Sequence, residues 1–146
     1  MTIQSFFWAS TLAVAFSIYS CASLKGVLVD RIVRDSFSRT YSVDFMSFHP
    51  KLHMALQDYA NKHRGSSFQV IRLGNDGVII QGIYKGERDQ DRLSTAITAK
   101  PAGPERTSME IRISSSNPDA SPKSLEMAAQ ELFRVVEKET GLHPSP

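Results

Sequence analysis

Residues 67–84, SFQVIRLGNDGVIIQGIY, contain the pattern on which the fold prediction depends. Two runs rich in Val and Ile lie on either side of Gly74-Asn75-Asp76-Gly77. β-Branched residues favour strands, and an Asn-Asp-Gly sequence offers the positive φ values that tight hairpin turns need. The stretch therefore predicts an antiparallel β-hairpin near the middle of the chain.

Apolar and polar side chains alternate in three further segments, with the period of two that half-buried strands show. These segments are residues 37–45, 93–99 and 109–113. In the first segment, Tyr41 and Phe45 are expected to share one face, and Arg39 interrupts its apolar character. In the last segment, Glu110 and Arg112 are expected on the outer face of the sheet.

Two other segments carry apolar residues at helical spacing, which predicts one buried stripe on each helix. The stripes are Phe48, Leu52, Ala55, Leu56 and Tyr59 in the first helix, and Leu125, Ala128, Leu132, Val135 and Val136 in the second. Ser47 and Ser121 are the predicted N-caps, and Pro122 fits the first helical position. Gly65 and Gly141 are expected to end the two helices.

The predicted order of elements is strand, helix, three or four antiparallel strands, helix. It defines an α+β fold, a two-layer sandwich in which an antiparallel sheet of four to five strands carries two helices on one face. An N-terminal signal or anchor helix is expected before this domain. The expected boundaries are 1–20 for a signal peptide, 21–35 for a tether, 36–141 for the single domain and 142–146 for a flexible tail.

The first 24 residues contain no charged side chain, and the only cysteine of the chain, Cys21, lies near their end. The sequence Ile18-Tyr19-Ser20-Cys21 follows an apolar run and resembles the lipobox of bacterial lipoprotein signals. That resemblance implies cleavage before Cys21 and attachment of lipid to its thiol. Tyr19, where small residues are usual, and the lack of Lys or Arg before Lys25 depart from the pattern.

Two other interpretations of the segment remain open: an uncleaved membrane anchor, and an ordinary secretory signal cut after Ala22. Lipid on Cys21 would hold the domain at a membrane, since each buried methylene contributes about 0.8 kcal/mol. Some bacteria use Asp after the lipidated cysteine as an inner-membrane retention signal. Because Ala22 stands there, the resemblance implies the outer membrane, with the domain facing the periplasm of a bacterial cell envelope.

Together with this signal, the predicted β-α-β-β-β-α order resembles that of small uncharacterised bacterial lipoproteins. The likeness spans roughly residues 36–141. It rests on the strand Tyr41-Ser42-Val43 before a helix, on residues 77–82 of the hairpin and on the strand 107–112. No activity is established for that group, so the resemblance implies fold and location only.

His49 and His53 are the weak candidates for metal ligands. Four residues apart on a helix, they share one face, but a zinc site needs at least one more ligand. The HExxH motif is absent, and Lys51 between them disfavours a cation. A solvated helix face is the preferred interpretation, so we predict no metal and no cofactor. The charged segment 86–92 is likewise expected to be a solvated loop rather than a calcium site.

The sequence contains no motif that predicts catalysis. No GxSxG elbow occurs, the glycines of the hairpin do not form a phosphate-binding loop, and the one cysteine is assigned to the signal. We therefore predict that the protein is not an enzyme. Its 17 basic and 15 acidic side chains give a net charge of +2, without the basic excess of nucleic-acid-binding domains.

The expected function is that of a lipid-anchored envelope accessory, which binds a protein partner or envelope component through the open sheet face or a strand edge. The alternative is a small-molecule or lipid carrier in the periplasm, with its ligand lodged between helix and sheet. That cavity would be lined by Phe48, Leu52, Ile80 and Leu132. A third hypothesis, a metal protein or enzyme, uses His49 and His53.

Overall fold

The computed structural model describes residues 32–86 and 92–146. Cys21, the predicted signal, most of the predicted tether and the acidic loop residues lie outside the described residues. The elements are β1 (Val33–Tyr41), α2 (Phe45–Lys62), β2 (Ser67–Gly74), β3 (Gly77–Tyr84), β4 (Leu93–Gly103), β5 (Arg106–Ser115) and α3 (Pro122–Thr140).

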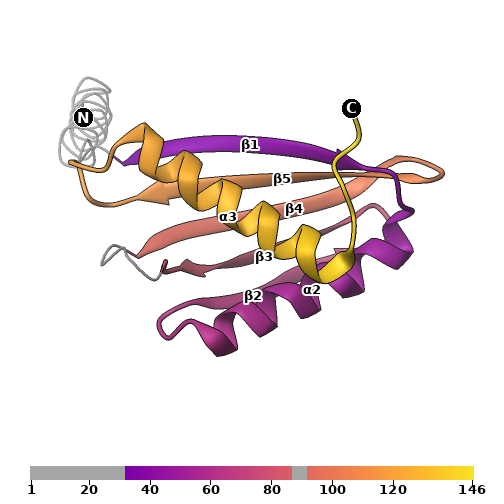
Figure 1. Cartoon of the computed structure of the whole chain (residues 1–146), viewed down its shortest axis with the longest axis horizontal. Helices are drawn as coiled ribbons and strands as arrows, with labels where there is room; N and C mark the ends of the chain where they lie inside the picture. The colour runs from indigo at the N-terminus through magenta and orange to yellow at the C-terminus, as the bar shows by residue number, and fades with distance from the viewer. Residues whose placement is uncertain (1–31, 87–91) are drawn as a thin grey trace, which may run out of the picture. The chain divides into compact units, whose positions relative to one another are not determined.

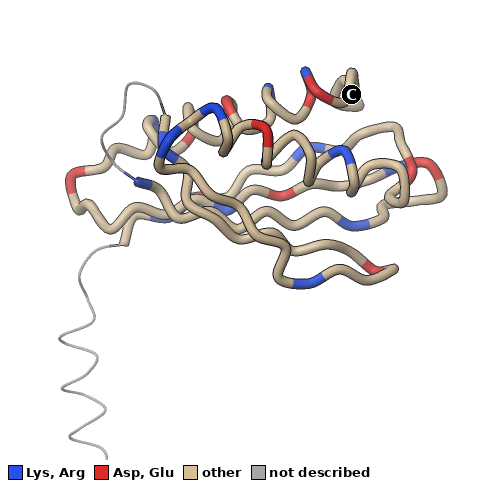
Figure 2. The backbone as a smooth tube through the Cα atoms, turned by 90° about the horizontal axis from the view of Figure 1, so that it is seen from below, with Lys and Arg blue, Asp and Glu red and all other residues tan. Residues whose placement is uncertain are grey.

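The described strands form one antiparallel sheet in the order β1-β5-β4-β3-β2. Both helices cover the same face of this sheet, as Figures 1 and 2 show. β1 pairs with β5, the strand furthest from it in sequence, so the first and last strands lie side by side. The predicted α+β two-layer fold is therefore confirmed, with five strands in the sheet.

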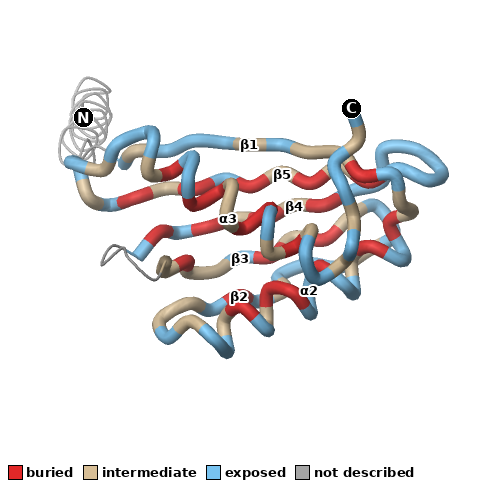
Figure 3. Tube along the Cα trace, in the orientation of Figure 1, coloured by how far each residue is buried: buried red, intermediate tan, exposed pale blue. Residues whose placement is uncertain are grey.

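The core lies between the helices and the covered face of the sheet (Figure 3). Ile80, Ile97 and Ile111 are paired across three neighbouring strands and are all buried. The alternation predicted for residues 93–99 and 109–113 is confirmed by the burial patterns of β4 and β5. Because successive side chains point to opposite faces, the same strands leave polar residues on the uncovered face.

The boundary between β1 and α2 differs from the prediction. β1 ends at Tyr41, and Phe45 is the first residue of α2 rather than the end of a strand. The N-cap is Asp44, whose carboxylate accepts a hydrogen bond from the Ser47 backbone N–H at 3.0 Å. The predicted cap at Ser47 is thus wrong. β1 also begins at Val33, three residues before the expected start of the domain at 36.

The predicted hairpin is present, with Asn75 and Asp76 between its two strands. None of the described non-glycine residues has a positive φ, so the positive φ values expected at this turn occur at Gly77 alone, with φ of 153°. A Cβ atom on Gly77 would lie 2.9 Å from the carbonyl oxygen of Ala99. Glycine is therefore required here both by conformation and by the approach of β4.

The cap predictions for α3 are confirmed. The Ser121 side chain accepts a hydrogen bond from the Ser124 backbone N–H at 3.1 Å, and Pro122 occupies the first turn. Gly141 ends the helix in the left-handed conformation, with φ of 67°.

The tail 142–146 is bound to the sheet rather than loose. The Ser145 backbone N–H donates to the Thr40 carbonyl at 2.7 Å, and Pro144 forms an isolated bridge with Tyr41. Ser145 and Ser42 also join their hydroxyls at 2.7 Å. This short segment therefore pairs with the outer edge of β1 at the carboxyl end of that strand.

Candidate functional site

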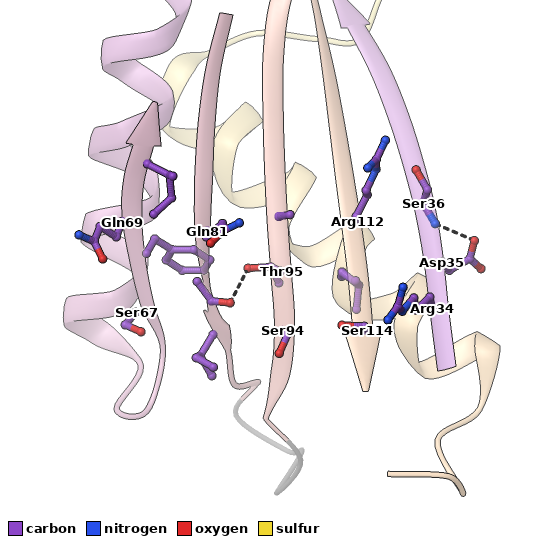
Figure 4. Close-up of a pocket in the computed structure, with 16 residues that line it drawn as sticks. Arg34, Asp35, Ser36, Ser67, Gln69, Gln81, Ser94, Thr95, Arg112 and Ser114 are labelled. Carbon is purple, nitrogen blue, oxygen red and sulfur yellow. Dashed lines mark hydrogen bonds between the residues drawn. The ribbon is translucent and has the colours of Figure 1, made fainter. Parts of the chain in front are cut away.

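The uncovered face of the sheet carries a hollow of about 890 Å³, which all five strands help to form. Figure 4 shows its side chains, with Ser94 and Thr95 lying between glutamines on one side and arginines on the other. We call this feature the open-face hollow. It lies on the opposite side of the sheet from the helices.

The strand register explains why a hollow forms at this place. Residues of the uncovered face form two rows across the strands. The rows are Gln69, Gln81, Ala96, Arg112 and Ser36, and Ser67, Ile83, Ser94, Ser114 and Arg34. The central strand β4 contributes the small side chains Ala96 and Ser94, whereas β3 contributes the longer Gln81 and Ile83 and β5 the longer Arg112. The hollow is therefore a trough over β4, walled by side chains of the flanking strands.

The wall formed by β1 and β5 carries Arg34 and Arg112, and Glu110 is paired with the second of them. The Glu110 carboxylate accepts from Arg112 Nε at 2.6 Å and from the Ser36 hydroxyl at 2.9 Å. The bond from Arg112, and then that from Ser36, holds the pKa of Glu110 below its ordinary value. Glu110 stays ionised at neutral pH and fixes the position of Arg112.

The opposite wall combines amide and apolar side chains. Gln69 and Gln81 are paired across β2 and β3, and Ile83 lies one row further along. Ile71, at the bulge in β2, is 53% exposed and also lines the hollow. The arrangement offers hydrogen-bonding groups and apolar contact within one site, which suits an amphipathic ligand.

The space between helices and sheet is packed, which corrects the predicted position of a ligand there. Side chains around a water-sized cavity would keep some accessible surface, but the four residues predicted to line it have none. They are Phe48, Leu52, Ile80 and Leu132, each with 0% exposure.

On the helix-covered side of the sheet, α3 takes part in two clusters of polar side chains that the sequence did not reveal. Glu131 of α3 accepts from the Tyr84 hydroxyl and from the Tyr59 hydroxyl, the latter at 3.3 Å. Glu137 accepts from the Tyr41 hydroxyl at 3.0 Å and from Arg39 Nη1 at 2.5 Å. Each glutamate of α3 is thus bonded to a tyrosine of the sheet.

Burial raises the pKa values of Tyr84 and Tyr41 far above that of a solvated tyrosine. The hydrogen bond to Glu131 raises the pKa of Tyr84 further, and the charge of Glu137 does the same for Tyr41. Both phenols therefore remain protonated donors, a state that suits anchoring rather than nucleophilic chemistry.

His49 and His53 do not gain a third ligand among the residues that the structure describes, in which no group of three His, Cys, Asp or Glu side chains is placed to hold a metal. The His53 ring lies 3.4 Å from the Gln57 side-chain amide, and the His49 ring packs against Phe45, with centroids 5.0 Å apart. The metal hypothesis accordingly finds no support in this geometry.

Within residues 32–86 and 92–146, neither helix is both long and apolar enough to cross a membrane.

No protein-family model matches the sequence, and no curated protein matches it. Solved structures that are similar include those titled Ara h 8.0201, with 12% identity, a TM-score of 0.42 and coverage of 74% of this chain and 97% of that chain. Mll3558 protein from Rhizobium loti has 14% identity, a TM-score of 0.41 and coverage of 75% and 99%. A START superfamily protein from Mycobacterium smegmatis has 11% identity, a TM-score of 0.31 and coverage of 75% and 93%. With TM-scores below 0.5, none of these likenesses assigns a function to this chain.

Proposed function

We propose that this protein is a non-enzymatic binding module that holds an amphipathic ligand in the open-face hollow. The observation that carries the proposal is the construction of the hollow, in which Ala96 of β4 lies between the longer Gln81 of β3 and Arg112 of β5. Its volume of about 890 Å³ lies within the range of about 300–1,000 Å³ that small-molecule sites occupy.

The chemistry of the lining supports binding rather than catalysis. The described side chains of the hollow include hydroxyl, amide and guanidinium groups, and neither His nor Cys is among them. The Ser36 hydroxyl donates directly to a carboxylate and has no imidazole beside it among the described lining residues. Such groups orient a ligand by hydrogen bonds, whereas an activated serine needs an adjacent base.

Filling the trough tests the proposal. The full chain, reconstituted in lipid nanodiscs, is dialysed to equilibrium against radiolabelled decanoate and radiolabelled 1-decanol, with empty nanodiscs as the blank. Ala96→Trp places an indole over β4 and is expected to abolish binding above the blank. Ser108→Trp, on the same face of β5 but outside the hollow, is the matched control and should bind as the unaltered protein does.

Two results would contradict the proposal. One is binding of neither probe by the unaltered protein. The other is equal binding by Ala96→Trp and Ser108→Trp, because the ligand would then lie elsewhere.

We also propose that lipid on Cys21 attaches the module to a bacterial envelope membrane, where an envelope protein partner or a membrane-derived ligand would be within reach. Cells that express the protein are grown with a labelled fatty acid, and Cys21→Ser is the comparison. Label on the unaltered protein and none on Cys21→Ser is the expected result. Equal label on both would exclude lipid attachment at this residue.

A further inference from the structure

We infer that the ligand of the open-face hollow carries an acidic head group, a carboxylate or a phosphate, which binds between Arg34 and Arg112. This inference rests on the proposed function. It adds the chemical class of the ligand and its orientation: the head at the wall of β1 and β5, and the apolar part over β4 towards β3.

The strand register makes the two arginines diagonal neighbours on one face of the sheet, with Arg112 extended along β5 towards Glu110. Arg34 of β1 is paired with Ser114, and Arg112 lies two residues before Ser114 on the same face of β5. Such diagonal neighbours lie about 7–8 Å apart at the backbone, a distance that two guanidinium side chains bridge through one bound anion. Figure 4 shows both arginines on the same side of the hollow.

The salt bridge to Glu110 offsets the charge of Arg112 but occupies only part of the hydrogen-bonding edge of its guanidinium group. The salt bridge uses Arg112 Nε, and no other described hydrogen bond involves its two terminal nitrogens. The Arg112 side chain is 73% exposed, so a ligand can reach it. Guanidinium groups bind carboxylate and phosphate through paired N–H donors, which gives both direction and strength.

Hydroxyl donors beside the two arginines fit the same interpretation. Ser114 and Ser36 are the strand partners of the two arginines and supply hydroxyls beside them. Asp35 is the one acidic residue among the described lining residues, and its carboxylate accepts from the Ser36 backbone N–H at 2.8 Å. With Glu110, which is paired with Arg112, this wall carries two arginines and two carboxylates, so an anion would be recognised by directed N–H and O–H donors rather than by an excess of positive charge.

The rest of the hollow suits an apolar chain. From Arg112, the same row crosses the small Ala96 on β4 before it reaches Gln81 on β3. Ile83 lies beside this path on β3, and the exposed Ile71 lies beyond it on β2. An alkyl chain laid across β4 would remove this apolar surface from water, which favours binding.

A chain-matched series tests the head group. Decanoate, decyl phosphate and 1-decanol share one alkyl chain and differ only in the head, and acetate and inorganic phosphate supply the anion without the chain. Binding to the full chain in nanodiscs is measured by equilibrium dialysis, with empty nanodiscs as the blank. The test variant is Arg34→Gln with Arg112→Gln. The control is Lys100→Gln, a cation of β4 outside the hollow.

We expect at least one acidic amphiphile to bind about tenfold more tightly than 1-decanol. The double arginine variant should lose that preference and still bind 1-decanol, whereas Lys100→Gln should keep it. The stronger of decanoate and decyl phosphate identifies the head group.

Equal binding of all three amphiphiles, or an unchanged preference in the double variant, would overturn the inference while leaving the proposed function in place. Binding of acetate or inorganic phosphate as tightly as the amphiphiles would also overturn it. Failure of all three amphiphiles to bind above the blank would instead contradict the proposed function itself.

Discussion

Gly82 allows β2 and β3 to approach each other at the edge of the open-face hollow. A Cβ atom at this position would lie 2.1 Å from the Ser67 carbonyl oxygen and 2.6 Å from a ring carbon of Phe68. The Gly82 carbonyl also accepts from the Thr95 hydroxyl at 3.1 Å, which ties it to β4. Any side chain here must therefore displace backbone rather than a flexible side-chain end.

We predict that Gly82→Ala destabilises the protein by about 1–3 kcal/mol, the usual cost of forcing extra volume into a packed site. Urea unfolding followed by circular dichroism measures the change. Gly74→Ala is the matched control in the same hairpin, since its Cβ would meet only the side chain of Asp76. Equal stability of the two variants would contradict the close approach of the strands.

Two arginines decide the character of the candidate site, and the sequence alone did not single out either of them. Arg112 was expected on the outer face because its strand alternates. Arg34 fell within the predicted tether, so nothing indicated that it would join the sheet. Their proximity depends on pairing between β1 and β5, whose residues are separated by about half of the chain.

Most strands and both helices could be predicted from the sequence, because each arises from a local period of apolar residues. The error at the start of α2 has a local cause as well. Alternation continues by coincidence past Tyr41 to Phe45, although the chain has already left the strand. Ser47 and Asp44 are both capable caps, and only the backbone geometry shows that the carboxylate of Asp44 takes the role.

α3 is held on the sheet by two tyrosines: Tyr84 of β3 donates a hydrogen bond to Glu131, and Tyr41 of β1 donates one to Glu137. We predict that Tyr84→Phe destabilises the protein by about 1–3 kcal/mol, because a hydrogen bond to a charged, partly buried group is lost. Urea unfolding at neutral pH measures this change. A change below about 0.5 kcal/mol would show that the bond contributes little to holding α3.

The same two tyrosines make the free energy of unfolding depend on pH in the alkaline range. The folded protein keeps the protons of Tyr84 and Tyr41 at pH values where the unfolded chain releases them, near the ordinary pKa of 10.0. Stability from these groups is therefore complete below pH 10 and falls as the pH rises above it. The decline should be shallower in Tyr84→Phe, and an identical slope would contradict the assignment.

The whole molecule has two faces with different roles. The helix-covered face is filled with apolar side chains and closed by hydrogen bonds, so it provides stability. The uncovered face carries the polar rows, the trough over β4 and the two arginines. The sequence predicted that one face would remain open, but not that small residues of the central strand would hollow it. That feature depends on the order of strands in the sheet, which no local period encodes.

A ligand bound on the uncovered face would change the backbone amide signals of that face, which nuclear magnetic resonance detects residue by residue. The ¹⁵N-labelled full chain in nanodiscs is titrated with decanoate while the backbone amide signals are followed. We predict shifts concentrated on β3, β4 and β5 around residues 81–83, 94–96 and 112–114, with little change in α2 and α3. Shifts centred on the two helices, or no shifts beyond those of a nanodisc sample given 1-butanol, would contradict it.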